Sequence, residues 1–306
     1  MSRRVRLLAW AAAACTYLLI VLGAVVRITG SGLGCGEHWP RCHGRWFPLL
    51  DDIGTLIEWN HRWVAALVTV LVVALAATAW WESRDTGNGT REAFVRPSGP
   101  SLRSGQASPT VRLSLVALGL LITQVLLGAV VVKLALPPWT VVLHLGTAML
   151  LLATLLVIAT SASPTPGWRP LGFSPGFRPG SVVLGVAFVT VLFGALTANL
   201  GAASACLGFP LCNGQLVPAG NSLQVLHWVH RLLGFALFAS LAVWAWRTRR
   251  AGIVAALVLV LLQIGIAAAM VLLALPRGLQ VAHAAVGTAV WAALVLAAQA
   301  ESAPTP

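Results

Sequence analysis

The chain has 306 residues, of which 58% are hydrophobic and only 9% are charged. About a quarter of the residues of a soluble globular domain are charged, so this composition excludes one and indicates a polytopic membrane protein. The net charge of +12 comes largely from arginines beside apolar runs. Such arginines are typical of membrane topology signals and argue against a nucleic-acid partner.

Apolar runs of about 20 residues match the length that a helix needs to cross a hydrocarbon core roughly 30 Å thick. Eight such runs predict an all-α integral membrane protein with both termini on one side of the membrane. The first run continues unbroken past Cys15, which favours an uncleaved helix over a signal peptide. The runs cover residues 6–26, 58–81, 113–133, 140–162, 181–199, 223–246, 252–274 and 280–300.

Arginines fall at the N-terminus and in alternate loops, and the positive-inside rule places these segments on the cytoplasmic side. We therefore expect both termini to be cytoplasmic and the remaining loops to face outward, with lipid around the helices. The arginines that carry this signal are Arg3, Arg4, Arg6, Arg84, Arg91, Arg96, Arg103, Arg112, Arg169, Arg178, Arg247, Arg249 and Arg250.

Two outward loops each contain a pair of cysteines. The first, GSGLGCGEHWPRCHG, carries Cys35 and Cys42, and the second, SACLGFPLCNG, carries Cys206 and Cys212. Because the outer side is oxidising, we expect the disulfides Cys35–Cys42 and Cys206–Cys212. Each can be a structural staple, but a thiol–disulfide role in electron or proton handling stays open for the first pair.

The second run begins with IEWNHRW, in which Glu58 and His61 share one helix face. A near copy, LHWVHRL, opens the sixth run with His230 in place of His61 and His227 in place of Glu58. Similarly, QVLLGAVVVKLALP matches QIGIAAAMVLLALP farther along the chain, and the same displacement superposes His144 on His283.

These matches predict two parallel-repeat four-helix bundles in the same membrane orientation. We place the N-terminal half at residues 1–165, a cytoplasmic hinge loop at residues 166–180 and the C-terminal half at residues 181–306. A segment rich in Gly, Ser, Pro and Arg at residues 82–112 is expected to be a flexible linker within the first half.

Four histidines are predicted at one depth: His61 and His144 in the first half, and His230 and His283 in the second. Ionisable groups in a bilayer are costly and usually mark function. Two histidines facing across a four-helix bundle suit axial ligation of a haem iron, whereas a closed zinc site needs four ligands. The His-Arg dipeptide selects His230 over its neighbour His227, which is left as a candidate contact at the haem edge.

Three charged residues beside these histidines have two interpretations each. Arg62 and Arg231 either pair with haem propionates or extend to lipid headgroups. Glu58 either acts at the porphyrin edge or pairs with an arginine near the membrane interface.

Together, VVRITGSGLGCGEHWPRCHG, the E-x-x-H-R motif at Glu58, the single histidines His144 and His283, and the second cysteine loop resemble the bacterial-type haem A synthase family. The resemblance covers essentially the whole chain. It implies an oxidoreductase of the plasma membrane that oxidises the C8 methyl group of haem O to a formyl group, making haem A for terminal cytochrome oxidases. The commoner family loop has an aspartate where His38 precedes the tryptophan.

The resemblance also implies roles for particular residues. Substrate haem O is expected at His61 and His144, a haem b cofactor at His230 and His283, and the family's essential acid at Glu58. Haem O synthase is the expected donor partner, and the electron acceptor is unidentified.

Two other classes of function fit the histidines. A two-haem b-type electron carrier holds both haems permanently, and a haem exporter or chaperone releases its haem unchanged. The presence of Glu58 in one half and His227 in the other favours an enzyme, because neither alternative needs an acid at a single haem.

Overall fold

A computed structural model describes residues 1–49, 51–92, 108–161 and 179–302 of the chain. Within these ranges the chain is all-helical, and eight of its helices are long and apolar enough to cross a membrane. The predicted all-α membrane fold with eight spanning helices is thereby confirmed. The helices are α1 (Arg3–Thr29), α2 (Ile53–Glu92), α3 (Pro109–Lys133), α4 (Pro138–Thr160), α5 (Pro179–Asn199), α6 (Ser222–Thr248), α7 (Ala251–Leu272) and α8 (Arg277–Ser302).

Helix α2 begins at Ile53, more than a turn before the predicted run. Its start is capped by Asp52, whose side-chain oxygen accepts a 2.7 Å hydrogen bond from the backbone N–H of Thr55. Hydrogen bonds from Thr55 lower the pKa of Asp52 below its ordinary value. Glu58 therefore lies in the second turn of α2 rather than at its first residue.

The far end of α2 also differs from expectation, because the helix continues to Glu92 and takes up the first part of the predicted linker at residues 82–112. The rest of that linker up to residue 107 lies outside the described residues. The predicted hinge at residues 166–180 lies outside them as well, except for its last two positions, where α5 begins.

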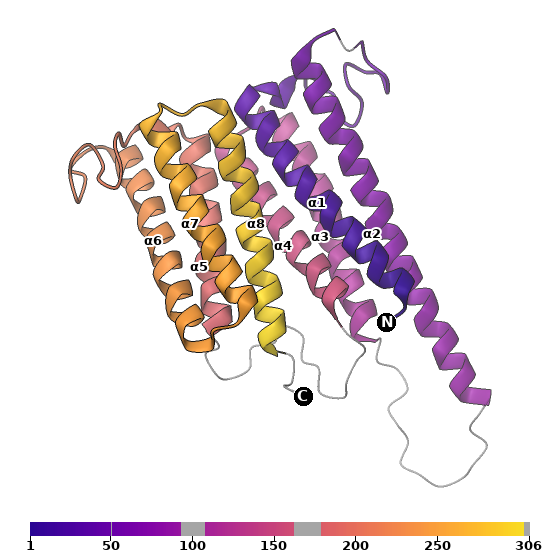
Figure 1. Cartoon of the computed structure of the whole chain (residues 1–306). Helices are drawn as coiled ribbons and strands as arrows, with labels where there is room; N and C mark the ends of the chain where they lie inside the picture. The colour runs from indigo at the N-terminus through magenta and orange to yellow at the C-terminus, as the bar shows by residue number, and fades with distance from the viewer. Residues whose placement is uncertain (50, 93–107, 162–178, 303–306) are drawn as a thin grey trace.

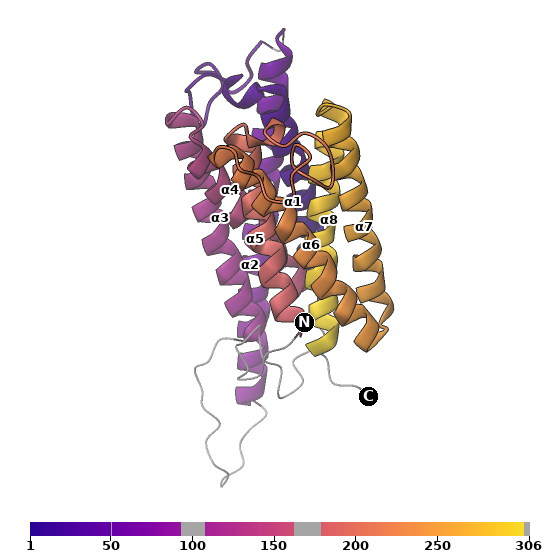
Figure 2. The same cartoon turned by 90° about the vertical axis from the view of Figure 1, so that its left-hand side faces the viewer.

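The helices pack as two rings of consecutive neighbours. In one ring α1, α2, α3 and α4 pack in order and α4 closes on α1, and α5 to α8 form the other ring in the same way. Figures 1 and 2 show both rings with the cysteine loops at one end and the chain termini at the other. The division into two parallel repeats stays a prediction, which this shared packing order supports.

Short connections also have matching backbones in the two rings. After α1, Gly30 adopts a left-handed conformation with φ 73°, and a 3₁₀ turn follows at Ser31–Leu33. After α5, Gly201 has the same φ of 73° and a 3₁₀ turn follows at Ala202–Ser204. Glycine adopts this conformation without the Cβ clash that other residues meet.

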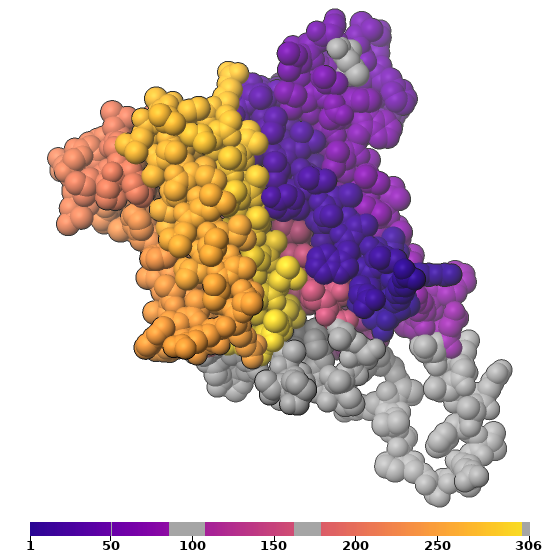
Figure 3. Space-filling view, viewed as in Figure 1, coloured from indigo at the N-terminus to yellow at the C-terminus, as the bar shows by residue number. Residues whose placement is uncertain are grey.

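The two rings meet through α1, α4, α5 and α8. Figure 3 shows α1 directly beside α8 across this boundary. Hydrogen bonds between described residues cross it: the indole Nε1 of Trp291 donates to the carbonyl of Met149 at 2.9 Å, and the hydroxyl of Tyr17 donates to the carbonyl of Ala285 at 3.1 Å. Such bonds give buried polar groups partners that lipid does not supply.

Candidate functional site

Both predicted disulfides are present at the cysteine-loop end of the molecule. Cys35–Cys42 and Cys206–Cys212 close loops of similar length, with Cα atoms 4.4 Å and 4.6 Å apart. All four cysteines are buried. In each loop, the second cysteine forms an isolated antiparallel bridge with the residue three positions later. The loops are therefore compact caps over the helix ends.

Arg62 holds the first loop to α2. Its Nη1 donates to three backbone carbonyls of the loop, those of His38 at 2.7 Å, Arg41 at 2.9 Å and Pro40 at 3.3 Å. A guanidinium suits this role because it carries several donors in a fixed plane. We call this arrangement an arginine clamp.

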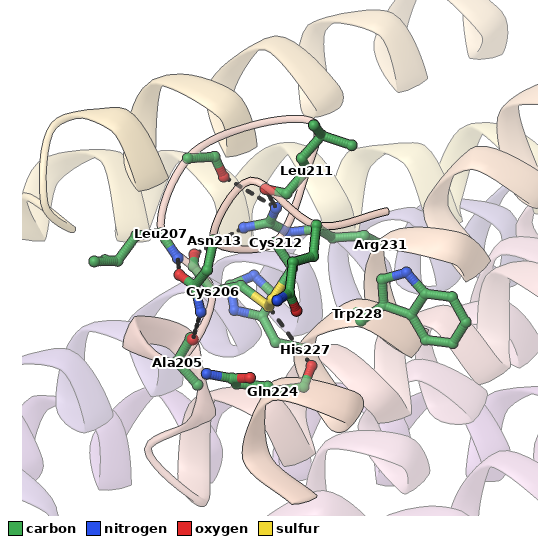
Figure 4. Close-up of a disulfide and its surroundings, with 12 residues drawn as sticks. Ala205, Cys206, Leu207, Leu211, Cys212, Asn213, Gln224, His227, Trp228 and Arg231 are labelled. Atoms are coloured by element: carbon green, nitrogen blue, oxygen red, sulfur yellow. Dashed lines mark hydrogen bonds between the residues drawn. A yellow bond between two sulfur atoms is a disulfide. The ribbon is translucent and has the colours of Figure 1, made fainter. Parts of the chain in front are cut away.

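Arg231 forms the matching clamp in the second half. Its Nη1 donates to the carbonyls of Leu211 at 2.9 Å, Gly208 at 3.0 Å and Pro210 at 3.3 Å, and its Nη2 donates to that of Cys206 at 2.9 Å. Figure 4 shows this side chain reaching toward the loop that the disulfide closes. The clamps are a third role for these arginines, beside the haem and lipid contacts that sequence reasoning weighed.

Glu58 is buried, with 4% of its surface exposed. One carboxylate oxygen accepts from Nη2 of Arg62 at 2.5 Å, and the other accepts from the backbone N–H of Cys35 at 2.7 Å. The ion pair with an arginine, one of the two interpretations of this residue, is thus present. In the second half, His227 bonds instead through Nδ1 to the carbonyl of Ala202 at 3.0 Å. Since the second loop is built without a carboxylate, holding a loop does not by itself account for Glu58.

Four histidines project from the even-numbered helices about two turns inside the cysteine-loop end, or ~9–12 Å along each helix at 1.5 Å per residue. His61 on α2 and His144 on α4 lie close enough to interact electrostatically, and His283 on α8 interacts in the same way with His230 on α6. Each half therefore brings together its own predicted pair. In the described ranges no group of three or more His, Cys, Asp or Glu side chains could hold a metal ion.

Glycines on neighbouring helices make room for the imidazoles. A Cβ added to Gly23 of α1 would lie 3.3 Å from Nε2 of His61, and one added to Gly194 of α5 would lie 2.8 Å from Cε1 of His230. Gly23 and Gly194 occupy matching places, each twelve residues before the first cysteine of its loop, at the start of the segments GAVVRIT and GALTANL. Both imidazoles thus lie where a larger residue would displace them.

The donor set fits axial ligation of a haem. The Nδ1 atoms of His144, His230 and His283 are buried and have no hydrogen-bond partner within the described part of the chain. Buried polar atoms normally have partners, so these unpaired imidazole nitrogens mark a site whose ligand contacts come from outside the protein. Paired imidazoles in a bundle core suit haem iron.

Sequence reasoning missed two glutamines beside these histidines. The side-chain Nε2 of Gln124 on α3 lies 3.1 Å from Nε2 of His144, and that of Gln263 on α7 lies 3.3 Å from Nε2 of His283. In the sequence, these glutamines were used only to align the two halves of the repeat. An amide side chain at the same position of two apolar runs could have revealed them, because a buried amide needs a hydrogen-bond partner.

His38 and His43 of the first loop are both exposed, as expected for loop residues. Nε2 of His43 lies 3.4 Å from the hydroxyl of Thr55, which in turn donates to the carbonyl of Gly34. These contacts connect the loop to the start of α2, at a distance from the histidine pairs.

Comparison with known proteins gives one consistent family. Residues 6–295 match the model of the COX15-CtaA family, described as cytochrome oxidase assembly protein. A protein of Shouchella clausii named "Heme A synthase" is 31% identical over 81% of this chain and 79% of its own length. Proteins of the same name from Bacillus licheniformis and Symbiobacterium thermophilum are each 30% identical, over 87% and 90% of this chain and 85% and 89% of their own lengths.

We predict that Arg62→Ala loosens the first loop without unfolding the helices, because three loop carbonyls lose their shared donor. Reduction of Cys35–Cys42 by a mild reductant should become several-fold faster, measured by maleimide labelling of the released thiols. Arg45→Ala, an exposed arginine of the same loop, is the matched control and should reduce at the wild-type rate. Equal rates for Arg62→Ala and wild type would show that the clamp does not restrain the loop.

Proposed function

The chain belongs to the COX15-CtaA family of cytochrome oxidase assembly proteins, and from this premise we propose that it converts haem O to haem A. The reaction oxidises the C8 methyl group of haem O to a formyl group, in successive hydroxylations. The observation that carries this proposal is the difference between two otherwise matching sites. Each half pairs two histidines at one depth, but among the described residues only the first half has a buried carboxylate beside them.

The first half is assigned the substrate. His61 and His144 would hold haem O through its iron, and the absence of a side chain at Gly23 makes room for the imidazole of His61. His230 and His283 would hold haem b, which supplies a one-electron redox centre when bound. His227, Arg62 and Arg231 stay candidate contacts at the edges of these haems.

Glu58 is assigned the proton chemistry at the substrate. Oxidation of a methyl carbon releases protons and develops positive charge, and a buried carboxylate can accept the first and stabilise the second. Arg62 and the N–H of Cys35 hold this carboxylate in one place, one helical turn from His61. Because both oxygens are already paired, accepting a proton requires Glu58 to give up one of these bonds.

The electrons withdrawn from the methyl group need an acceptor. Haem b in the second half would receive them and pass them on to an unidentified membrane electron acceptor. Haem O synthase would deliver the substrate, and terminal cytochrome oxidases would receive the product. The disulfide Cys35–Cys42 is assigned a structural role here, because Arg62 and Glu58 both bind its loop.

We place the protein in the plasma membrane with both termini cytoplasmic and the cysteine loops outside. Two features support this orientation. Arginines gather near the ends of the helices that lie opposite the cysteine loops, including Arg3, Arg4 and Arg247. Disulfides persist in oxidising surroundings, which are found outside the cell rather than in the cytoplasm.

Extraction of the haems from purified protein, co-expressed with a source of haem O, tests the function directly. We expect haem A or its hydroxylated precursor beside haem b, identified by chromatography with mass detection. Two unmodified haem b molecules per chain would instead indicate an electron carrier. Release of unchanged haem to an acceptor protein, without any oxidised product, would indicate an exporter.

Glu58→Gln should keep both haems bound but lower haem A formation by about 100-fold or more, the usual contribution of a positioned acid–base group. The amide still accepts the Cys35 N–H, so the loop is retained while the proton acceptor is lost. Haem content and haem A yield are measured on the same preparation. Wild-type yield in Glu58→Gln would remove the catalytic assignment and leave the ion pair as the purpose of this residue.

His283→Ala should abolish the low-spin haem b spectrum, because an axial ligand is removed. His144→Ala is the matched variant in the other half and should leave that spectrum in place while substrate haem is lost. Reduced-minus-oxidised absorbance spectra of the two purified variants distinguish them. If His144→Ala lost haem b and His283→Ala kept it, the assignment of the two halves would be reversed.

A further inference from the structure

Arg27 lies one turn outward of the place where α1 meets a histidine. It follows Gly23 by four residues, so the two share a face of α1. A Cβ added to Gly23 would lie 3.3 Å from Nε2 of His61. Long side chains on a helix lean back toward its N-terminus. In α1 this direction leads from Arg27 to Gly23, which brings the guanidinium to the side of the helix that faces His61.

The guanidinium of Arg27 has no anionic partner within the described part of the chain. No side-chain hydrogen bond or ion pair of Arg27 is found there, and the ion pair at this end of the molecule joins Arg62 to Glu58. Arg27 is nevertheless half-buried rather than exposed. Withdrawing a charge from water without pairing it is costly. An anion from outside the protein is therefore the expected partner of this arginine.

The second half has no cation at the matching position. The displacement that superposes Gly23 on Gly194 brings Arg27 onto Ala198. The second half nevertheless keeps the glycine beside His230, the disulfide-closed loop and the arginine clamp. Supporting the loop and the imidazole therefore does not require an arginine at this position, and Arg27 serves something that only the first half does.

The haem assigned to the first half carries anions that suit Arg27. Its propionate carboxylates would point from the histidines toward the nearer aqueous surface, at the cysteine-loop end, because charge is costly in the hydrocarbon core. Arg27 lies between the level of the histidines and that end, in the last turn of α1. An arginine can bind a carboxylate in bidentate fashion. Arg62 is less available, because its Nη1 and Nη2 already donate to loop carbonyls and Glu58.

We propose that Arg27 is a substrate-binding residue whose guanidinium pairs with a propionate carboxylate of the haem held by His61 and His144. This inference rests on the proposed function and deepens it, because it names the part of the substrate that the first half binds away from the iron. Axial ligands leave the haem free to rotate about the iron, whereas a bound propionate fixes that rotation. The C8 methyl group neighbours a propionate-bearing carbon of the ring. Fixing this edge at Arg27 therefore directs the methyl group toward the level of Glu58, which also lies one turn outward of His61.

The test compares the binding of haem O with that of its dimethyl ester, in which the propionates carry no charge. Each is titrated into full-length protein in detergent with haem b already bound, and binding is followed by the change in Soret absorbance. We expect the wild type to bind haem O about 30-fold more tightly than the ester, as a charge-assisted hydrogen-bonded pair predicts. Arg27→Met, which keeps a long side chain without the charge, should bind haem O about 30-fold more weakly and lose most of this preference.

Lys133→Met is the matched control. Lys133 also lies in the last turn of an odd-numbered helix of the first half, and its counterpart in the second half is the apolar Leu272. Because Lys133 is exposed, removing its charge should leave the affinities for both haems at their wild-type values. Arg27→Lys keeps the charge but not the planar fork of donors, so it should retain part of the preference for haem O.

Equal affinities of the wild type for haem O and its ester would overturn the inference, and this comparison needs no variant to fold. An Arg27→Met protein that binds both haems equally more weakly than the wild type, or as tightly, would overturn it too. Those results would indicate an arginine that supports the helix end or binds lipid phosphate. The proposed function fails separately: a wild type that prefers haem O to its ester but forms no haem A would contradict the synthesis and leave the role of Arg27 in propionate binding intact.

Discussion

The rest of the site depends on the two arginine clamps. Arg62 and Arg231 each donate hydrogen bonds to several backbone carbonyls of an irregular loop. Each arginine directly follows a histidine of a pair in sequence. A clamp therefore connects the loop to the helix turn that carries the imidazole, and the disulfide closes the loop above it. In this way a surface loop and a buried ligand become one connected unit in each half.

Both halves share the disulfide-closed loop and the arginine clamp, but they differ at the position of Glu58 and His227. Glu58 adds a carboxylate to the network of Arg62, where the second half has His227 bonded to the carbonyl of Ala202. The difference places charge and proton-accepting capacity beside only one histidine pair. The loop itself is preserved in both halves, so the change alters the chemistry of the site while leaving its support intact.

Sequence patterns were sufficient for the features that depend on composition and local spacing. The apolar runs predicted the spanning helices, and the cysteine pairs in two loops expected to face outward predicted both disulfides. The start of α2 was misplaced because its first turn contains Gly54 and Thr55 and depends on the cap supplied by Asp52. The targets of Arg62 and the partner of Gln263 were not predictable, because one binds main-chain carbonyls and the other a side chain on the next helix. Such contacts follow from tertiary packing, which leaves little trace in a single sequence.

The packing also sets how far apart the two histidine pairs lie. His144 lies on α4 and His283 on α8, and these two helices pack against each other at the boundary between the rings. The bond from Trp291 to the carbonyl of Met149 joins the same two helices farther from the cysteine loops. Because the ligand-bearing helices are direct neighbours, their packing sets the separation of the two sites. Under the assignment proposed above, electrons withdrawn in the first half would cross this contact between α4 and α8 to reach the second half.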